Sequence, residues 1–295
     1  MLTYLVFRLG SLICSYLPTW IGYRLAALAG FVAYAFMAHR RANVGANLRQ
    51  ALGPRVSEGE RQRLVRGVFY NGAANYYELL RLPRMGLDEL DPRVRLSGFE
   101  HVVRAHAEGR GVILVSGHLG CFEAVAQVLA ARHLPVTVPA EPVKPRRLFD
   151  FVASLRSSHG LKYIPAEPGV MRRLIRSLRE GEIVGLAVDR DVRGDGLPLE
   201  FFGRVATFQT GAAVLARRLG VPVLVAFAVR RPGNKAEVFV EPPVAIMVTD
   251  DEVQDLLANM RTLLAIVAKY VRAYPDQWVA FEPIWPNAGE RNDVA

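Results

Sequence analysis

The side chains best suited to acid–base chemistry are His118 and Glu123, in the stretch SGHLGCFE that follows an apolar run. Gly117 permits a sharp turn, after which His118 stands where the next helix is expected to begin. A neutral imidazole can take a proton from an attacking hydroxyl, and a carboxylate on its other nitrogen fixes the tautomer and stabilises the imidazolium. With His118 in the turn and Glu123 in the first turns of the helix, the two can converge. The spacing predicts a general-base pair that acts on a substrate hydroxyl.

Other interpretations of this stretch are weaker. A lone histidine is usually structural, but the five remaining histidines have no comparable setting. A zinc site is disfavoured because the HxxxxE spacing lacks the paired histidines of HExxH, so no metal is expected. Cys121 as a nucleophile has no separate histidine partner in view, and a buried cysteine commonly acts as a small hydrophobe.

A second chemically rich segment is DRDVRGDGLPLEFFGR, residues 189–204, which follows another apolar run. Its glycines let backbone approach a ligand, and arginine forks suit phosphate oxygens. We expect Arg190 and Arg193 to recognise an anionic group, with Arg204 as a weaker candidate. Glu200 has no assigned role. A calcium loop is disfavoured because the EF-hand glycine and terminal glutamate are missing, whereas a solvated loop stays open as an alternative.

A third basic group follows a different predicted strand. Lys144, Arg146 and Arg147 could contact the phosphates or the acidic surface of a ligand. An equally good interpretation is a solvated helix start.

The elements that must position these groups alternate in type along the chain. Apolar runs bounded by glycine or charged residues predict buried strands at 111–116, 136–138, 162–164, 183–188 and 221–229, with a hairpin partner at 235–240. Helices are expected at 42–52, 57–82, 120–131, 145–158, 170–179, 210–219 and 253–270. This order predicts an α/β layered domain, with a central, largely parallel (mixed) sheet flanked by helices. In such sheets, sites lie beyond the carboxyl ends of the strands.

Residues 1–41 differ from the rest. In the first 38 residues only Arg8 and Arg24 are charged, and a basic flank of His39, Arg40 and Arg41 follows. A spanning helix needs about 20 apolar residues, and the uninterrupted run here is shorter. We expect N-terminal membrane-associated helices, either one tilted span or a monotopic hairpin hinged at Pro18, on the cytoplasmic face of the inner membrane. A pair of buried core helices is the alternative. The catalytic domain is expected to span 42–295.

Composition limits the class of protein. The chain has 295 residues, 51% hydrophobic, and a formal net charge of +9. This excludes a mostly disordered chain, and two cysteines cannot build a disulfide framework. A basic, apolar protein suits an anionic surface, and charge alone does not separate membrane from nucleic acid. The sequence has no RNP, zinc-finger or helix-turn-helix signature, so no nucleic-acid partner is expected.

Four stretches together resemble a known family, the late lipid A acyltransferases and phosphatidylinositol mannoside acyltransferases of the lysophospholipid acyltransferase superfamily. HLGCFE resembles the H-x4-D/E motif, and the other three stretches are the NL…ALG run after a basic pair, the D-x…FFG segment ending at Gly203, and the QW…W close from Gln277 to Trp285. Together they cover almost the whole chain. Cys121 is a departure, because relatives usually have a polar residue there.

The resemblance implies a membrane-associated O-acyltransferase. It would move a fatty acyl group from acyl-CoA or acyl carrier protein to a hydroxyl of a glycolipid such as a lipid A precursor or a phosphatidylinositol mannoside, with no other cofactor. His118 would be the base, Glu123 would orient it, and backbone amides near Gly117–Gly120 would be candidates for stabilising the oxyanion. Arg190, Arg193, Arg204, Lys144 and Arg147 would bind substrate. The basic group with Lys144, Arg146 and Arg147 would contact the phosphates of coenzyme A or the acidic face of an acyl carrier protein. The rivals are an acyl-thioester hydrolase that uses the same pair, and a non-catalytic membrane-surface binder.

Overall fold

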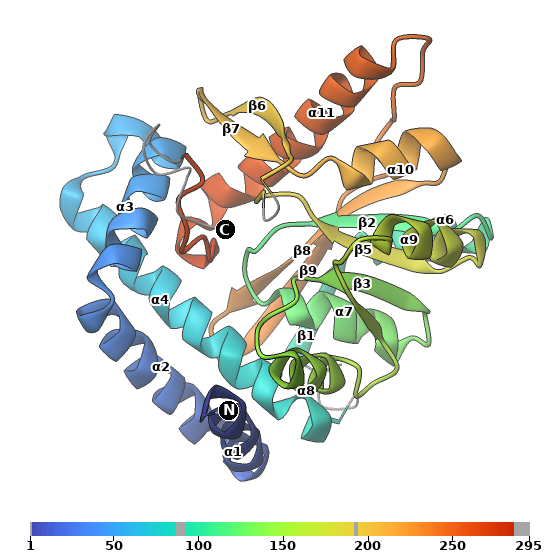
Figure 1. The fold of residues 1–295 in the computed structure, drawn as a ribbon. Coiled ribbons are helices and arrows are strands. Elements are labelled where there is room, and N and C mark those ends of the chain that lie inside the picture. The colour runs from blue at the N-terminus through green and yellow to red at the C-terminus, as the bar shows by residue number, and fades with distance from the viewer. Residues whose placement is uncertain (1, 87–92, 192–193, 286–295) are drawn as a thin grey trace.

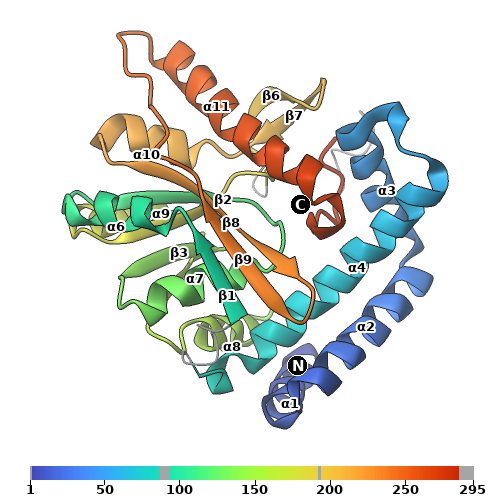
Figure 2. The same cartoon turned by 180° about the vertical axis from the view of Figure 1, so that it is seen from behind.

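The computed structural model describes residues 2–86, 93–191 and 194–285. Its first four helices form an arm along one side of the molecule (Figures 1 and 2). The breaks between them follow local chemistry: Pro18 precedes the second helix, Gly53 ends the third, and the Ser57 side chain caps the fourth by accepting from the Glu60 amide at 3.2 Å. The four helices are α1 (Leu2–Tyr16), α2 (Thr19–Phe36), α3 (Ala38–Leu52) and α4 (Glu58–Arg81).

Helices α1, α2 and α3 all pack against α4, and α4 joins this arm to the rest of the protein through its contact with the turn at Pro275–Gln277. The α2–α4 contact is close: a Cβ on Gly22 would collide with the Tyr77 ring, and one on Gly30 would meet the backbone at Phe69 and Tyr70. Within the described residues, no single helix is long and apolar enough to cross a membrane. Helices 19–36 and 38–55 reach that length and apolarity only as a pair bent by 94°.

The centre is a seven-stranded sheet in the order β1-β9-β8-β2-β5-β3-β4. All neighbouring strands in it are parallel except β8 and β9, which are antiparallel. The predicted α/β class, with a largely parallel mixed sheet and a hairpin at its last two strands, is therefore confirmed. The strands are β1 (Val94–Ser97), β2 (Val112–Ser116), β3 (Val136–Ala140), β4 (Lys162–Pro165), β5 (Ile183–Ala187), β8 (Val223–Arg231) and β9 (Lys235–Val240).

Helices cover both faces of the sheet, and the alternation of side chains along β2 shows the two layers. Ile113 and Val115 belong to the larger core, which α9, α10 and α11 cover. Val112 and Leu114 belong to the smaller core under α6 and α7. The covering helices are α6 (Phe99–Ala107), α7 (Phe122–Ala131), α8 (Arg146–Arg156), α9 (Val170–Arg179), α10 (Gly211–Leu219) and α11 (Glu252–Ala273).

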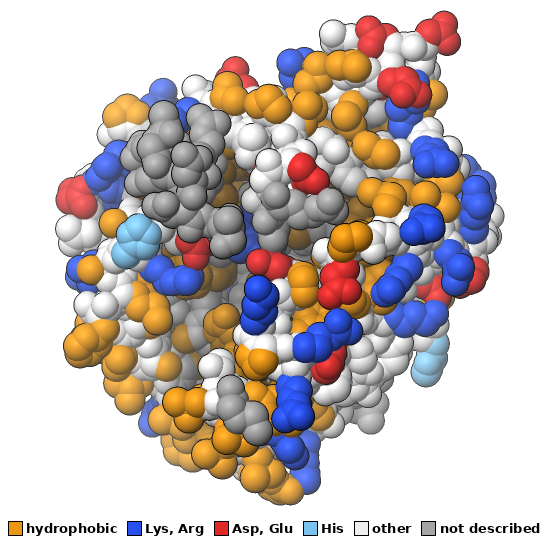
Figure 3. Space-filling view, in the orientation of Figure 1, with side chains coloured by type: hydrophobic (Ala, Val, Ile, Leu, Met, Phe, Trp, Pro, Cys, Tyr) orange, Lys and Arg blue, Asp and Glu red, His pale blue; other side chains and the backbone are white. Residues whose placement is uncertain are grey.

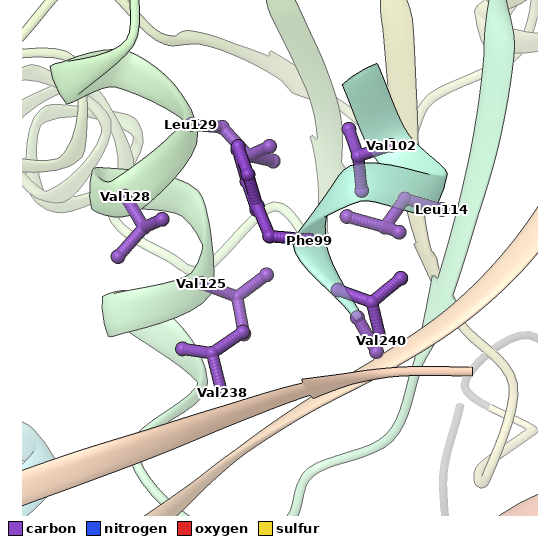
Figure 4. A pocket seen from close by; sticks show the side chains of 9 residues that line it. Phe99, Val102, Leu114, Val125, Val128, Leu129, Val238 and Val240 are labelled. Carbon is purple, nitrogen blue, oxygen red and sulfur yellow. The ribbon is translucent and has the colours of Figure 1, made fainter. Parts of the chain in front are cut away.

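The smaller core contains a packing gap between α6 and α7. Figure 4 shows Phe99, Val125 and Leu129 around it, with Val238 and Val240 of β9 below. Every residue that lines the gap is apolar. It offers no group that could transfer a proton or bind a charge, so the chemistry lies elsewhere.

The structure departs from the expected elements at several points. The segment expected as a loop between Asp189 and Gly203 contains β6 (Leu197–Phe201), which pairs antiparallel with β7 (Arg204–Phe208) in a separate two-stranded sheet. Strand β1 was also not expected, because a four-residue run gives little periodic signal. Short 3-10 turns extend the helical regions at η1 (Gly53–Arg55), η2 (Leu82–Arg84) and η4 (Pro275–Gln277).

Candidate active site

The loop from Gly117 to Cys121 joins β2 to α7 and is held by backbone bonds on both sides. The Cys121 amide donates to the Ala228 carbonyl of β8 at 2.9 Å, and the Gly120 amide donates to the Gln277 carbonyl at 2.8 Å. Gly120 has a φ of +70°, which favours glycine, and a Cβ there would collide with the Ala228 carbonyl. The loop therefore has one defined path, and it places His118 at the carboxyl end of β2.

His118 is held by Asp189, which follows the neighbouring strand β5. The His118 Nδ1 atom lies 2.8 Å from Asp189 Oδ1, and the His118 backbone amide donates to Asp189 Oδ2 at 2.9 Å. The indole Nε1 of Trp278 donates to the same Oδ2 atom at 3.1 Å. Asp189 is completely buried, whereas the His118 side chain is 28% exposed. Gly117 leaves room for this contact, since a Cβ there would lie 3.1 Å from Asp189 Cγ.

The charge state of Asp189 fixes the tautomer of His118. Burial alone would raise the pKa of Asp189, but the charge of His118 and its two hydrogen bonds lower that pKa to about 2. An ionised carboxylate can only accept hydrogen bonds, so His118 Nδ1 must carry a proton. The Nε2 atom of a neutral His118 is then the basic nitrogen. A carboxylate–imidazole pair of this kind can remove a proton from a hydroxyl.

Glu123 lies elsewhere than the sequence analysis expects. Its Oε1 atom accepts two bonds of 2.7 Å from the Arg156 guanidinium of α8, and its Oε2 lies 3.4 Å from the Tyr163 hydroxyl of β4. The position at His118 Nδ1 is occupied by Asp189, so the expected contact between Glu123 and His118 is replaced. The reason is geometric: Glu123 is the second residue of α7 and faces α8 and β4.

The backbone amides expected to stabilise an oxyanion are mostly engaged. Those of His118, Leu119 and Gly120 donate to Asp189 Oδ2, to the Gly117 carbonyl and to the Gln277 carbonyl. This corrects the expectation for these three donors, because their bonds hold the loop. Cys121 is buried, and burial raises the pKa of its thiol to about 12, which keeps it protonated near neutral pH.

Among the predicted anion-binding residues, Arg190 lies nearest to the His118–Asp189 pair in the chain. Its guanidinium is 3.8 Å from Glu141 Oε2, and its Nε is buried without a hydrogen-bond partner within the described ranges. It also contributes to lowering the pKa of Asp189. Arg193 lies outside the described residues. Arg204 is exposed at the start of β7, and its carbonyl accepts from the Trp285 indole at 3.1 Å.

The third basic group lies at the start of α8, after β3. All three side chains are exposed. Arg146 pairs with Asp150 at 2.9 Å and with Glu167 at 3.3 Å, whereas Lys144 and Arg147 have no ion pair among the described residues. The strands β2, β3 and β5 run parallel, so their carboxyl ends lie on the same side of the sheet. His118, Arg190 and the start of α8 follow these strands and therefore belong to that side.

Sequence reasoning assigned no role to Asp189 beyond a rival metal ligand, and it gave Trp278 and Gln277 only as parts of a motif. The available signal was an aspartate directly after an apolar strand. What the sequence could not supply is that β5 lies next to β2.

Comparisons with known proteins agree on one family of acyltransferases. Residues 1–287 match the family model described as bacterial lipid A biosynthesis acyltransferase. A phosphatidylinositol mannoside acyltransferase of Mycobacterium tuberculosis is 28% identical over 216 residues, which cover 70% of this chain and just under two thirds (66%) of that protein. The lipid A biosynthesis lauroyltransferase of Escherichia coli is 26% identical over 277 residues, 89% of this chain and 84% of that protein.

Among solved structures, a 1-acyl-sn-glycerophosphate acyltransferase from Thermotoga maritima is similar over 86% of this chain and 98% of its own, with 16% identity and a TM-score of 0.40. The family match extends over nearly the whole sequence, including all four stretches that carried the resemblance. The chain belongs to the bacterial lipid A biosynthesis acyltransferase family.

Proposed function

We propose that this protein is a membrane-associated O-acyltransferase that uses His118 as its general base. The observation that carries the proposal is the 2.8 Å contact between His118 Nδ1 and the buried Asp189, which leaves Nε2 as the basic nitrogen on a partly exposed ring. Family membership supports acyl transfer as the reaction class.

In the proposed reaction, His118 Nε2 takes the proton of an acceptor hydroxyl while the hydroxyl oxygen attacks the carbonyl carbon of an acyl thioester. The tetrahedral intermediate then collapses, and the carbon–sulfur bond breaks. The departing thiolate takes the proton back from the imidazolium, which gives an ester and a free thiol. Asp189 stabilises the imidazolium between these steps.

For the acceptor we propose a glycolipid of the kind named in the relatives, a lipid A precursor or a phosphatidylinositol mannoside. The donor is acyl-CoA or acyl carrier protein. Arg190 is suited to bind an anionic group of either substrate, because its Nε has no hydrogen-bond partner among the described residues and its guanidinium lies as far as 3.8 Å from Glu141 Oε2. Arg193, Arg204, Lys144 and Arg147 remain proposed contacts on the same reasoning as in the sequence analysis.

Membrane association is supported by the outer surface of α1 and α2. Figure 3 shows hydrophobic side chains gathered over these helices. Phe36 is 83% exposed, Leu2 76% and Phe31 66%. Contiguous exposed apolar surface of this kind marks interaction sites, and a lipid interface suits helices that also carry arginine. We place this surface on the cytoplasmic face of the inner membrane. Its other exposed apolar members are Leu5, Val6, Leu9, Leu12, Ile13, Tyr16, Trp20, Leu25, Leu28 and Val32.

The activity test uses purified protein, hexadecanoyl-CoA or dodecanoyl-CoA, and either a phosphatidylinositol dimannoside or a tetraacylated lipid A precursor. We expect a new acylated lipid and free coenzyme A in equal amounts, and at least about 100-fold less of both with His118→Ala. Release of free fatty acid at the same rate with and without acceptor would indicate a thioester hydrolase instead. Thioester left intact by a folded wild-type protein, with acyl-CoA or acyl carrier protein as donor, would contradict the proposal.

The membrane test uses co-sedimentation with vesicles that contain phosphatidylglycerol. Substituting Leu28 and Phe31 with Gln removes apolar area from the outer face of α2, and we expect weaker binding. Matched control substitutions are Val248→Gln and Val253→Gln, which are equally exposed near the start of α11. Equal binding by both double variants and the wild type would remove this surface from membrane contact.

A further inference from the structure

A buried arginine lies behind the His118 loop and outside the proposed chemistry. Arg230 is in β8, its side chain is 8% exposed, and its guanidinium pairs with both oxygens of Glu78 on α4. The Arg230 Nε donates to Asn71 Oδ1 at 3.0 Å, and one terminal nitrogen donates to Asn75 Oδ1 at 2.7 Å. Tyr23 of α2 donates to Glu78 at 2.5 Å, so three elements meet at this ion pair.

Asn75 connects this ion pair to the His118 loop. While its Oδ1 accepts from Arg230, its Nδ2 donates to the Gly120 carbonyl at 2.9 Å. An amide has one acceptor end and one donor end. Because the guanidinium has only donors, it fixes the oxygen of Asn75 toward itself and therefore turns the NH2 toward Gly120. The charge of Arg230 thus decides which way the amide faces.

The other side of Gly120 is held by Gln277, which pairs with the backbone of Arg230. The Gln277 side chain accepts from the Arg230 amide at 2.8 Å and donates to the Arg230 carbonyl at 3.0 Å. The backbone carbonyl of Gln277 accepts from the Gly120 amide at 2.8 Å. Both backbone polar groups of Gly120, two residues after His118, are therefore held: the carbonyl by Asn75, which the Arg230 guanidinium orients, and the amide by Gln277, which pairs with the backbone of β8.

We propose that Arg230, acting through Asn75, is a positioning residue that sets the path of the loop carrying His118. The inference rests on the proposed role of His118 as base. Stability alone is a poor reason for this arrangement, since well-packed apolar side chains hold a helix against a strand as well as a buried ion pair does. What apolar side chains cannot do is orient the Asn75 amide and fix the Gly120 carbonyl.

The chain supplies a matched pair of variants, Asn75→Asp and Asn71→Asp. Both asparagines are on α4, both are buried, and both accept from Arg230 through Oδ1. Aspartate keeps that acceptor and removes the donor. At position 75 the lost donor holds the Gly120 carbonyl, whereas at position 71 it holds the Gly67 and Asp276 carbonyls.

For Asn75→Asp we expect kcat for acyl transfer from hexadecanoyl-CoA to fall about 10- to 100-fold with KM nearly unchanged, because a small displacement of the base affects the chemical step. For Asn71→Asp we expect both constants within about threefold of wild type, because the donor lost there does not bond to Gly120. Melting temperatures check that both variants are folded, and Asn75→Ala serves as a second variant at the same site. Equal losses of kcat at positions 71 and 75, or a loss confined to KM, would overturn the proposal.

An activity-independent measurement keeps the inference separate from the proposed function. Diethyl pyrocarbonate modifies accessible imidazoles, and mass spectrometry of peptides reports the rate at His118. Asn75→Asp should change that rate by at least about threefold and Asn71→Asp should not, because only the first frees the loop to open locally. An unchanged rate in Asn75→Asp would overturn the inference even in a fully active enzyme. A changed rate in a protein without acyl-transfer activity would support loop positioning while the proposed function fails.

Discussion

Asp189 and Glu123 are both buried carboxylates near the ends of parallel strands, but their partners differ in kind. Asp189 contacts an imidazole, which can change its charge, together with a backbone amide and an indole. Glu123 contacts the Arg156 guanidinium, which is always charged, and a tyrosine hydroxyl. A carboxylate opposite a titratable ring can assist proton transfer, whereas one opposite a permanent cation holds elements together. We therefore propose acid–base chemistry for Asp189 and His118, and a positioning role for Glu123 and Arg156.

The largest expected effect is the loss of turnover in His118→Ala, and His159 of the same chain provides the control. His118→Ala should lower acyl-transfer turnover by about 10²- to 10⁴-fold, the usual contribution of a general base. His159 is a suitable control because its Nδ1 lies 2.6 Å from Gln127 in a structural hydrogen bond. His159→Ala should stay within about threefold of wild type, since it loses no base. Equal rates for wild type and a folded His118→Ala would remove His118 from the mechanism.

Substitution of Arg190 tests whether the residue after Asp189 binds an anionic group of a substrate. Arg190→Ala should raise KM for the anionic substrate about 10- to 100-fold, because a bond to a charged group contributes about 1.5–3 kcal/mol. A phosphate remote from the reacting hydroxyl binds similarly in ground and transition states, so kcat should change less. Lysine should restore binding only in part, since it lacks the guanidinium fork.

Steady-state kinetics with donor and acceptor varied separately identifies which substrate Arg190 contacts. Arg218→Ala is the control, because Arg218 is exposed at the end of α10. If KM for both substrates is unaltered in Arg190→Ala, Arg190 binds neither of them.

Glu123→Gln should show its main effect in stability. The substitution leaves the Arg156 guanidinium without a carboxylate partner. The Arg156 side chain is 23% exposed. The loss in free energy of unfolding should therefore be about 2–3 kcal/mol, below the 3–5 kcal/mol of a fully buried pair, because water reaches the guanidinium. Urea unfolding followed by circular dichroism measures it. A variant as stable as the wild type would show that the Glu123–Arg156 pair does not hold α7 to α8.

The smallest expected effect is an acid-dependent loss of stability that belongs to Asp189. Its pKa is lowered from 3.8 to about 2 in the folded protein, so its ionised form stabilises the fold above pH 4. As pH falls from about 4 to about 2, the wild type should lose about 2 kcal/mol that Asp189→Asn does not lose. Parallel pH dependences for the two proteins would mean that the Asp189 pKa is not lowered by folding.

The sequence predicts those parts of the fold that depend on local pattern. The Ser57 cap, the α9 helix and the β8–β9 hairpin lie where periodicity and turn residues place them. Partners at long range were not predictable. The Asp189 contact depends on β5 lying beside β2, which is a property of strand order. The hydrogen bonds of Trp278 with Asp189 and of Gln277 with Gly120 join residues about 90 to 160 positions apart, for which no local signal exists.

The most direct test of the central claim compares the turnover of Asp189→Asn with that of Glu123→Gln under saturating donor and acceptor. Asparagine keeps the size of the side chain but favours the wrong tautomer of His118, so we expect a loss of about 10²- to 10⁴-fold, no larger than that of His118→Ala. Glu123→Gln, in its folded fraction, should lose about tenfold or less, because it acts only through positioning. The reverse order, with Glu123→Gln nearly inactive and Asp189→Asn close to wild type, would contradict the assignment of Asp189 as the partner of the catalytic base.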